Sequence, residues 1–243
     1  MSGPSLRPNR GRVIIAAAVA ALIVAASAGY AVIRVRQHEA AGLRPSGIPA
    51  GVSTSLANLM QLSPVPVTSA PGFTLTDQGG QTMSLASLRG RVVVLEFMDP
   101  HCTHICPIVS QEFLDAYHDL GASAPHVVFL AVNVNRYHLQ VADVAAFSSE
   151  QRLTQIPAWH FLTGSYPSLR AVWQAYQIQV DAPGPDADVI HSSQLYFIDP
   201  QGRERFLASP MADHTASGSS YLPAGQLASW GQGIALVARQ LAA

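Results

Sequence analysis

Residues 91–107 read RVVVLEFMDPHCTHICP, and this stretch decides the fold. Its first part, residues 91–98, is a nearly continuous apolar run rich in β-branched side chains, which is typical of a strand buried on both faces of a sheet. Pro107 suits the first turn of a helix, and apolar side chains then recur at near-helical spacing until Gly121. The stretch predicts a buried strand followed directly by a helix, with both cysteines of the chain at the junction.

The sequence continues to alternate between strand and helix patterns. Strands are expected at residues 73–76, 127–134, 159–162, 194–199 and 203–208, and helices around 141–147, 168–176 and 224–241. The last two strands flank the turn Asp199-Pro200-Gln201-Gly202, which predicts a hairpin. This order predicts an α/β domain with parallel crossovers over residues 71–243.

An apolar segment near the amino terminus predicts a membrane anchor. Residues 13–33, VIIAAAVAALIVAASAGYAVI, carry no charge and, at about 1.5 Å per residue, just span a hydrocarbon core of about 30 Å. The arginines before this segment place residues 1–12 in the cytoplasm by the positive-inside rule, and the domain outside the cell membrane. A cleaved signal peptide is the competing interpretation, because Ala26-Ser27-Ala28 has the pattern of a cleavage site. Both interpretations export the domain.

Residues 34–70 predict a flexible tether between anchor and domain. They carry several prolines among Gly, Ser and Ala, with little periodicity, and only residues 56–62 suggest one or two helical turns. The formal net charge of the chain is −1, and its 14 basic residues are all arginines spread along the sequence. Because the arginines form no basic stripe along the sequence, we do not expect a nucleic-acid-binding protein.

Cys102 and Cys106 are the candidate functional pair. If both lie in the first turn of a helix, their Cβ atoms are about 5–6 Å apart on one face, where they can form a disulfide or bind one metal ion. A helix N-terminus also favours the thiolate, which attacks disulfides and binds metals. A disulfide closing so short a loop stabilises a fold little. The residues leave thiol exchange, metal binding and an inert disulfide open.

A metal site at this pair needs a third ligand, because two thiolates underfill most metal sites. Among the nine histidines, His191 lies just before the strand expected at 194–199. Loops at strand ends of an α/β sheet meet near the helix N-terminus that carries the cysteines. A lone histidine before a strand is more often a surface or hydrogen-bonded residue. Asp99 is a candidate orienting group or a plain strand-end residue.

Residues 73–107, together with His191 and the following SSQLYFIDPQG, resemble the Sco/SenC family of copper chaperones. That family is thioredoxin-like and has a CxxxCP motif and a distant histidine. Here the motif is Cys102, Cys106 and Pro107, and His191 follows 85 positions after the second cysteine. Residues 165–180 also resemble the family's helix before the histidine loop.

The resemblance implies a function in copper handling. It implies that Cys102, Cys106 and His191 bind copper, as Cu(I) and also as Cu(II), and that the protein helps to build the copper-A site of cytochrome c oxidase. The implied partners are the oxidase subunit that carries this site and other copper chaperones or thiol reductants. Soft thiolates select Cu(I), whereas structural zinc usually takes four ligands. The same dithiol can also reduce cysteines of a partner.

The sequence departs from the family in the cysteine loop. The family often has an acidic residue two places after the first cysteine, and this chain has His104 there. His101 and His104 are open as further metal ligands, as groups that favour the thiolates, or as solvated loop residues.

Two other functions stay open as alternatives, and a third, peroxiredoxin activity, is disfavoured. Thiol-disulfide oxidoreductases of the thioredoxin type have CxxC and a proline before the late strand, whereas this chain has CxxxC and Ser192-Ser193. Oxidoreductase activity through Cys102 and Cys106 without copper is therefore the first alternative. A peroxiredoxin would need Pro and Thr where this chain has Phe97 and Asp99. The last is a binding module without catalysis.

Overall fold

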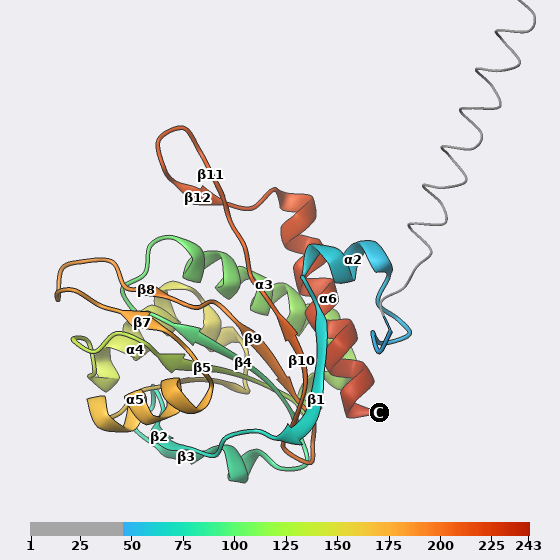
Figure 1. Ribbon diagram of the computed structural model, residues 1–243, viewed down its shortest axis with the longest axis horizontal. Helices are drawn as coiled ribbons and strands as arrows, with labels where there is room; N and C mark the ends of the chain where they lie inside the picture. The colour runs from blue at the N-terminus through green and yellow to red at the C-terminus, as the bar shows by residue number, and fades with distance from the viewer. Residues whose placement is uncertain (1–45) are drawn as a thin grey trace, which may run out of the picture. The chain divides into compact units, whose positions relative to one another are not determined.

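The computed structural model describes residues 46–243, and its main sheet has six strands in the order β1-β10-β9-β4-β5-β6 (Figure 1). The strands are β1 (Ser63–Ser69), β4 (Val92–Met98), β5 (Val127–Asn133), β6 (Trp159–Leu162), β9 (Leu195–Ile198) and β10 (Arg203–Ala208). β4, β5 and β6 are parallel, whereas β9, β10 and β1 pair antiparallel with their neighbours. The expected α/β sheet with parallel crossovers and a late hairpin is confirmed, and it is the thioredoxin-like arrangement that the resemblance implies.

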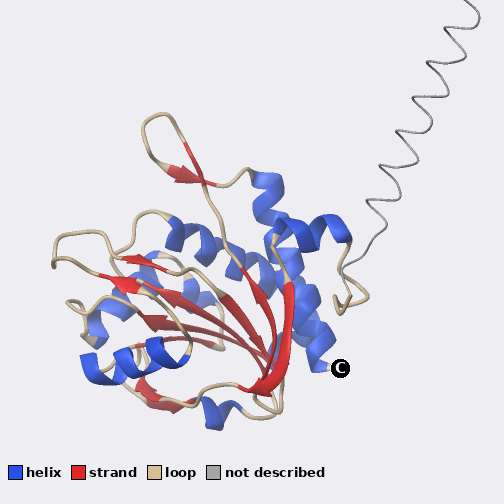
Figure 2. Ribbon diagram, viewed as in Figure 1, coloured by secondary structure: helices blue, strands red, loops and turns tan. Residues whose placement is uncertain are grey.

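Helices cover both faces of this sheet (Figure 2). The described helices are α2 (Thr54–Leu59), α3 (Ile105–Leu120), α4 (Val141–Glu150), α5 (Tyr166–Ala175) and α6 (Ala224–Ala242), with short 3-10 turns η1 (Leu85–Leu88), η2 (Gly121–His126) and η3 (Leu153–Gln155). Three small hairpins complete the fold: β2 (Thr74–Thr76) with β3 (Thr82–Ser84), β7 (Val180–Asp181) with β8 (Ile190–His191), and β11 (Asp213–His214) with β12 (Ser220–Tyr221). α3 ends at Leu120 and is capped by Gly121, the predicted stop.

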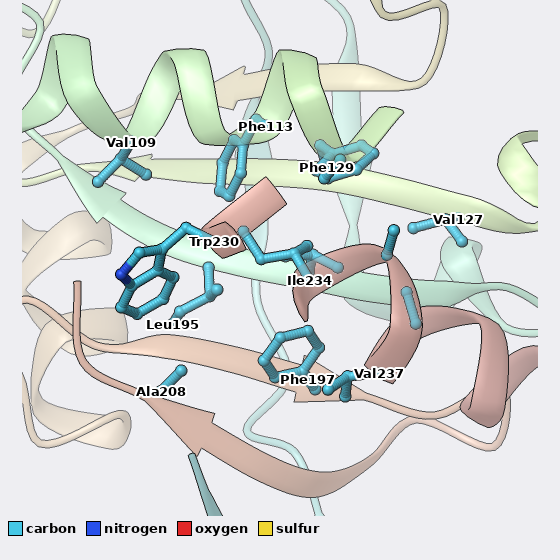
Figure 3. Packing of buried hydrophobic residues seen from close by; sticks show 14 of the residues in the cluster. Val109, Phe113, Val127, Phe129, Leu195, Phe197, Ala208, Trp230, Ile234 and Val237 are labelled. Carbon is cyan, nitrogen blue, oxygen red and sulfur yellow. The ribbon is translucent and has the colours of Figure 1, made fainter. Parts of the chain in front are cut away.

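The core lies on both sides of β4, whose seven residues are all buried. Because side chains alternate across a strand, one set of β4 residues packs with α3 and α6 and the other with α5 and the β2–β3 hairpin. Figure 3 shows the first side, where Phe113 of α3 and Ile234 of α6 lie near Phe129 and Phe197 of the sheet. The prediction of a strand buried on both faces is confirmed.

The predicted boundary at residue 71 is wrong, because α2 and β1 belong to the fold. β1 pairs antiparallel with β10, and Val52 and Met60 are fully buried beside α6. The prolines that suggested a tether, Pro64 and Pro66, lie in β1, which is an edge strand, and an edge strand tolerates residues without an N–H donor. Of the predicted tether, only residues 34–45 lie outside the described part of the chain.

The predicted anchor at residues 13–33 and the segment 1–12 also lie outside the described residues. Within residues 46–243, no helix combines the length and the apolar character needed to cross a membrane.

The topology brings three loops to one edge of the sheet. β4 and β5 end side by side, since Met98 pairs with Asn133. β9 runs antiparallel to β4, and its first residues therefore lie at the same edge, with Tyr196 opposite Leu95. The loops after β4 and β5 and the segment before β9 thus meet there, as expected for the ends of strands in such a sheet.

Candidate functional site

The two cysteines lie at the start of α3, although not both within it. α3 begins at Ile105, so Cys106 is its second residue, whereas Cys102 precedes the helix. Asp99 turns the chain there: its Oδ1 accepts the N–H of His101 at 2.9 Å, and its carbonyl oxygen accepts the N–H of Cys102 at 3.1 Å. The two cysteines therefore do not share a helical turn, because the turn at Asp99 delays the start of the helix.

The two thiols nevertheless face each other, and no disulfide joins them. The N–H of Cys106 donates to the sulfur of Cys102 at 3.4 Å. The hydrogen bond from the thiol of Cys106 lowers the pKa of Cys102 to about 6, and the N–H groups of Cys106 and His104 act in the same direction, against burial. That shared hydrogen bond and burial raise the pKa of Cys106 well above its usual value. At neutral pH the pair is therefore a half-buried Cys102 thiolate held by a buried Cys106 thiol.

His191 lies in β8, at the same sheet edge as the cysteines. Its Nδ1 is 3.0 Å from the carbonyl oxygen of Ser192, and because a carbonyl only accepts, this nitrogen carries the proton. Nε2 is left with the lone pair that a metal needs. Burial lowers the pKa of His191, which keeps the imidazole neutral at pH 7. A hydrogen bond of this kind fixes the tautomer of histidines that bind metals.

A pocket of about 310 Å³ brings two of the three predicted ligands together, since Cys102 and His191 both line it, as do Asp99 and His104; Cys106 is not among its lining residues. The predicted trio is not closed, however. Among residues 46–243, one trio of His, Cys, Asp or Glu side chains has its ligand atoms within 4.8 Å of one another. That trio is His101, His138 and Asp143 and not the predicted one. Since metal–ligand bonds are about 2.0–2.3 Å, His191 has to approach the sulfurs before one ion can bond to all three.

His104 links the cysteine loop to the histidine loop. Its Nε2 is 3.6 Å from Oδ2 of Asp188, three residues before His191. Both side chains are at least half exposed, so this contact contributes little stability, of the order of 1 kcal/mol or less. At the place where the family often has an acid, this chain thus pairs a histidine with an acid from the opposite loop.

Two buried carboxyl groups behind the site were missed by sequence reasoning. Glu96 on β4 is 1% exposed, and the hydroxyl of Ser193, two residues after His191, donates to its Oε1 at 3.4 Å. Burial raises the pKa of Glu96 to about 8. Burial and the charge of Glu96 also raise the pKa of Glu112 on α3, whose carboxylate oxygens have no hydrogen-bond partner among the described residues. The available signal was a single acid inside the apolar run of residues 91–98.

Comparison with known proteins gives one consistent result. The family model described as SCO1/SenC matches residues 65–217, a segment that contains both cysteines and His191. The SCO1 protein homolog of Bacillus subtilis is 28% identical over 133 residues, which cover 54% of this chain and 68% of that protein. The mitochondrial SCO2 homolog of Bos taurus is 29% identical over 136 residues. This match covers 54% of the chain but only 50% of the bovine protein.

Solved structures of similar fold include two described as having copper bound. ScoI of Bradyrhizobium japonicum superposes with a TM-score of 0.55 at 21% identity, covering 72% of this chain and 99% of that one. ScoI of Arabidopsis thaliana superposes with a TM-score of 0.52 at 22% identity, covering 58% of this chain and 88% of that one. BsSco superposes with a TM-score of 0.51 at 26% identity, covering 60% of this chain and 84% of that one. It is described as having a disulfide switch and as a member of the Sco family of cytochrome c oxidase assembly proteins. The first two likenesses establish the fold.

Proposed function

The chain belongs to the SCO1/SenC family, and we propose that it is an extracytoplasmic copper chaperone that binds copper through Cys102, Cys106 and His191. The observation that carries this proposal is the pairing of a thiolate at Cys102 with a neutral, correctly protonated His191 in one pocket. Two sulfurs and one imidazole nitrogen form a soft, three-ligand set that favours Cu(I) over hard cations. The solved relatives described as copper-bound support the same metal.

The asymmetry of the thiols suggests how copper enters. Cys102 is half-buried and already ionised at neutral pH, so it offers the first ligand without losing a proton. Cys106 is buried and protonated, and it has to release one proton as the ion bonds to its sulfur. Closure of His191 onto the ion then completes the set, and the hydrogen bond to Ser192 keeps Nε2 available.

The proposed recipient is the copper-A site of cytochrome c oxidase. Support comes from the family and from BsSco, which is described as belonging to a family of oxidase assembly proteins. A position outside the membrane, with residues 13–33 as an anchor and residues 34–45 as the remaining tether, would present the pocket to such a partner. Labelling of intact cells with a membrane-impermeant maleimide tests this position, because the cysteines of an exported domain are modified before lysis.

Cuprous affinity tests the ligand set. The reduced full-length chain is titrated with Cu(I) without oxygen, against a chromophoric chelator, beside His191→Ala and the matched control His214→Ala on the exposed β11. Loss of a direct ligand should weaken binding by more than the 10- to 100-fold typical of a lost supporting group, while the control keeps the affinity of the original chain. Equal affinities for all three chains would remove His191 from the site.

A second function, reduction of a partner's disulfide, is favoured by the lowered pKa of Cys102. The Cys102 thiolate would attack one sulfur of the partner's disulfide, forming a mixed disulfide and releasing the other sulfur as a thiolate. Cys106, after losing its proton, would then attack the sulfur of Cys102. The partner leaves with two reduced cysteines, and this chain keeps the disulfide. Mass spectrometry of Cys106→Ser with an oxidised copper-A fragment tests this, since only this mechanism predicts a trapped mixed disulfide at Cys102.

A further inference from the structure

A second cluster of ligand groups lies beside the dithiol. It brings together His101 from the turn after β4, His138 from the loop after β5 and Asp143 from the first turn of α4. Nε2 of His101 is 3.8 Å from Oδ1 of Asp143, and the two imidazole rings stack with their centroids 3.7 Å apart. All three ligand atoms lie within 4.8 Å of one another. No other trio among the described residues is so compact.

Hydrogen bonds to buried side chains hold the backbone of both histidines. Oδ1 of Asp99, which accepts the N–H of His101, also accepts the Nδ2 amide of Asn135 at 3.0 Å, and this bridge ties the loop after β4 to the loop after β5. The side chain of Asn133 donates to the carbonyl oxygen of His138 at 2.7 Å. Because Asp99 and both asparagines are buried, the two histidines are carried by rigid supports, as a binding site requires.

Hydrogen bonds also fix the orientation of the Asp143 carboxylate and the tautomer of His138. Oδ2 of Asp143 accepts the N–H of Gln140 at 2.9 Å as part of the cap of α4, which leaves Oδ1 for His101 or a metal. Nε2 of His138 lies 3.0 Å from the carbonyl oxygen of Pro185, so Nε2 carries the proton and Nδ1 has the free lone pair. A histidine that donates to a carbonyl through its other nitrogen is the usual arrangement at metal sites.

We propose that His101, His138 and Asp143 form a second metal site. This site binds divalent first-row transition-metal ions and prefers Cu(II) among them. Two imidazoles and one carboxylate suit Cu(II) and Zn(II), and affinity for such sites generally peaks at Cu(II). Bonds of about 2.0 Å place ligand atoms about 3 Å apart, so side-chain rotations that shift each ligand atom by about 1 Å close the site. This site is chemically distinct from the soft dithiol and does not depend on it.

The surroundings of the cluster leave room for the remaining ligands of the ion. A pocket of about 490 Å³, lined among others by His101, Cys102 and Asp143, opens beside it. Water can therefore fill the coordination positions that the protein leaves open. Cys102 lines the same pocket, so the cluster and the thiolate open onto a common space.

Cu(II) binding by the full-length chain in which both cysteines are replaced, C102S/C106S, tests the proposal independently of cuprous binding at the dithiol. We expect one Cu(II) per chain, with nitrogen couplings in its electron paramagnetic resonance spectrum. His138→Ala and Asp143→Asn should each weaken binding at least tenfold in this background, whereas His118→Ala, on the exposed side of α3, should leave it unchanged. Zn(II) should compete, and millimolar Mg(II) should not.

Three results would overturn the proposal: no stoichiometric Cu(II) in C102S/C106S, a Cu(II) affinity that neither substitution changes, or displacement by Mg(II). Asp143→Asn retains the size of the side chain, and its thermal melting curve, compared with that of C102S/C106S, separates a lost ligand from a lost fold. If it melts differently, His138→Gln replaces it in the same comparison.

Discussion

Glu96 offers a sharp prediction, because a carboxyl group that stays protonated in the folded chain makes stability depend on pH. Its pKa is raised from 4.5 to about 8 by burial. Below pH 4.5 the group is protonated in both the folded and the unfolded state. Between about 4.5 and 8 the unfolded chain releases the proton and the folded chain keeps it, so the free energy of unfolding falls as pH rises. Above about pH 8 the contribution is constant.

The size of the effect follows from the pKa shift. One pKa unit corresponds to about 1.4 kcal/mol, so Glu96 alone reduces the free energy of unfolding by up to about 5 kcal/mol between acid and alkaline pH. Glu96→Gln keeps a neutral side chain of nearly the same shape at every pH and should remove this loss. The free energy of unfolding of the variant is expected to rise relative to that of the original chain from pH 5 to about pH 8, and to keep a constant lead above that pH.

Urea unfolding of the two chains at several pH values, followed by far-ultraviolet circular dichroism, measures this difference. Comparing the two chains cancels the titrating groups that Glu96 does not affect, including Cys102, whose lowered pKa acts in the opposite direction. Glu112 is not one of them, because the charge of Glu96 helps to raise its pKa. Glu150→Gln, at an exposed position of α4, is the matched control and should track the original chain. If Glu96→Gln and the original chain keep parallel pH profiles, the buried carboxyl is not held protonated and the reasoning is refuted.

Three further predictions address the thiols, the docking of α2 and the loop contact. Alkylation of the reduced chain by iodoacetamide should show a pH midpoint near 6 from Cys102, and a midpoint near 9 would contradict its lowered pKa. Gly233→Ala should destabilise the chain by about 1–3 kcal/mol in thermal melting, because an added Cβ would overlap the sulfur of Met60, which caps α2, and crowd Leu56 within α2; an unchanged melting temperature would show that α2 does not pack there. Asp188→Asn should weaken Cu(I) binding less than about fivefold, since its pair with His104 is exposed, and a loss as large as that of a ligand would make it part of the site.

The elements around the site were predictable because their hydrophobic patterns are local. The buried run at β4 and the helical spacing of α3 follow from contiguous residues, and they placed Cys106 correctly. β1 was missed because its prolines resemble a tether in sequence, and only its pairing with β10 at the sheet edge explains them. The position of Cys102 before the helix depends on a turn made by the side chain of Asp99, which periodicity does not report.

Contacts between distant segments mark the limit of sequence reasoning. His191 was identified through a family resemblance and the general geometry of strand ends, and the shared pocket agrees with that placement. His138 and Asp143 carried no signal, because their proximity to His101 arises only when the loops after β4 and β5 meet. The effect of the Glu96 charge on the pKa of Glu112 likewise connects a strand with the helix that covers it.

The central claim is that two sulfurs and one histidine nitrogen hold one copper ion. X-ray absorption at the copper edge of the reduced full-length chain, loaded with one equivalent of Cu(I), tests it most directly. The account predicts two sulfur neighbours and one nitrogen neighbour, with the nitrogen lost in His191→Ala and kept in His138→Ala. A copper ion surrounded by sulfur alone in the original chain, or a nitrogen that persists in His191→Ala, would contradict it.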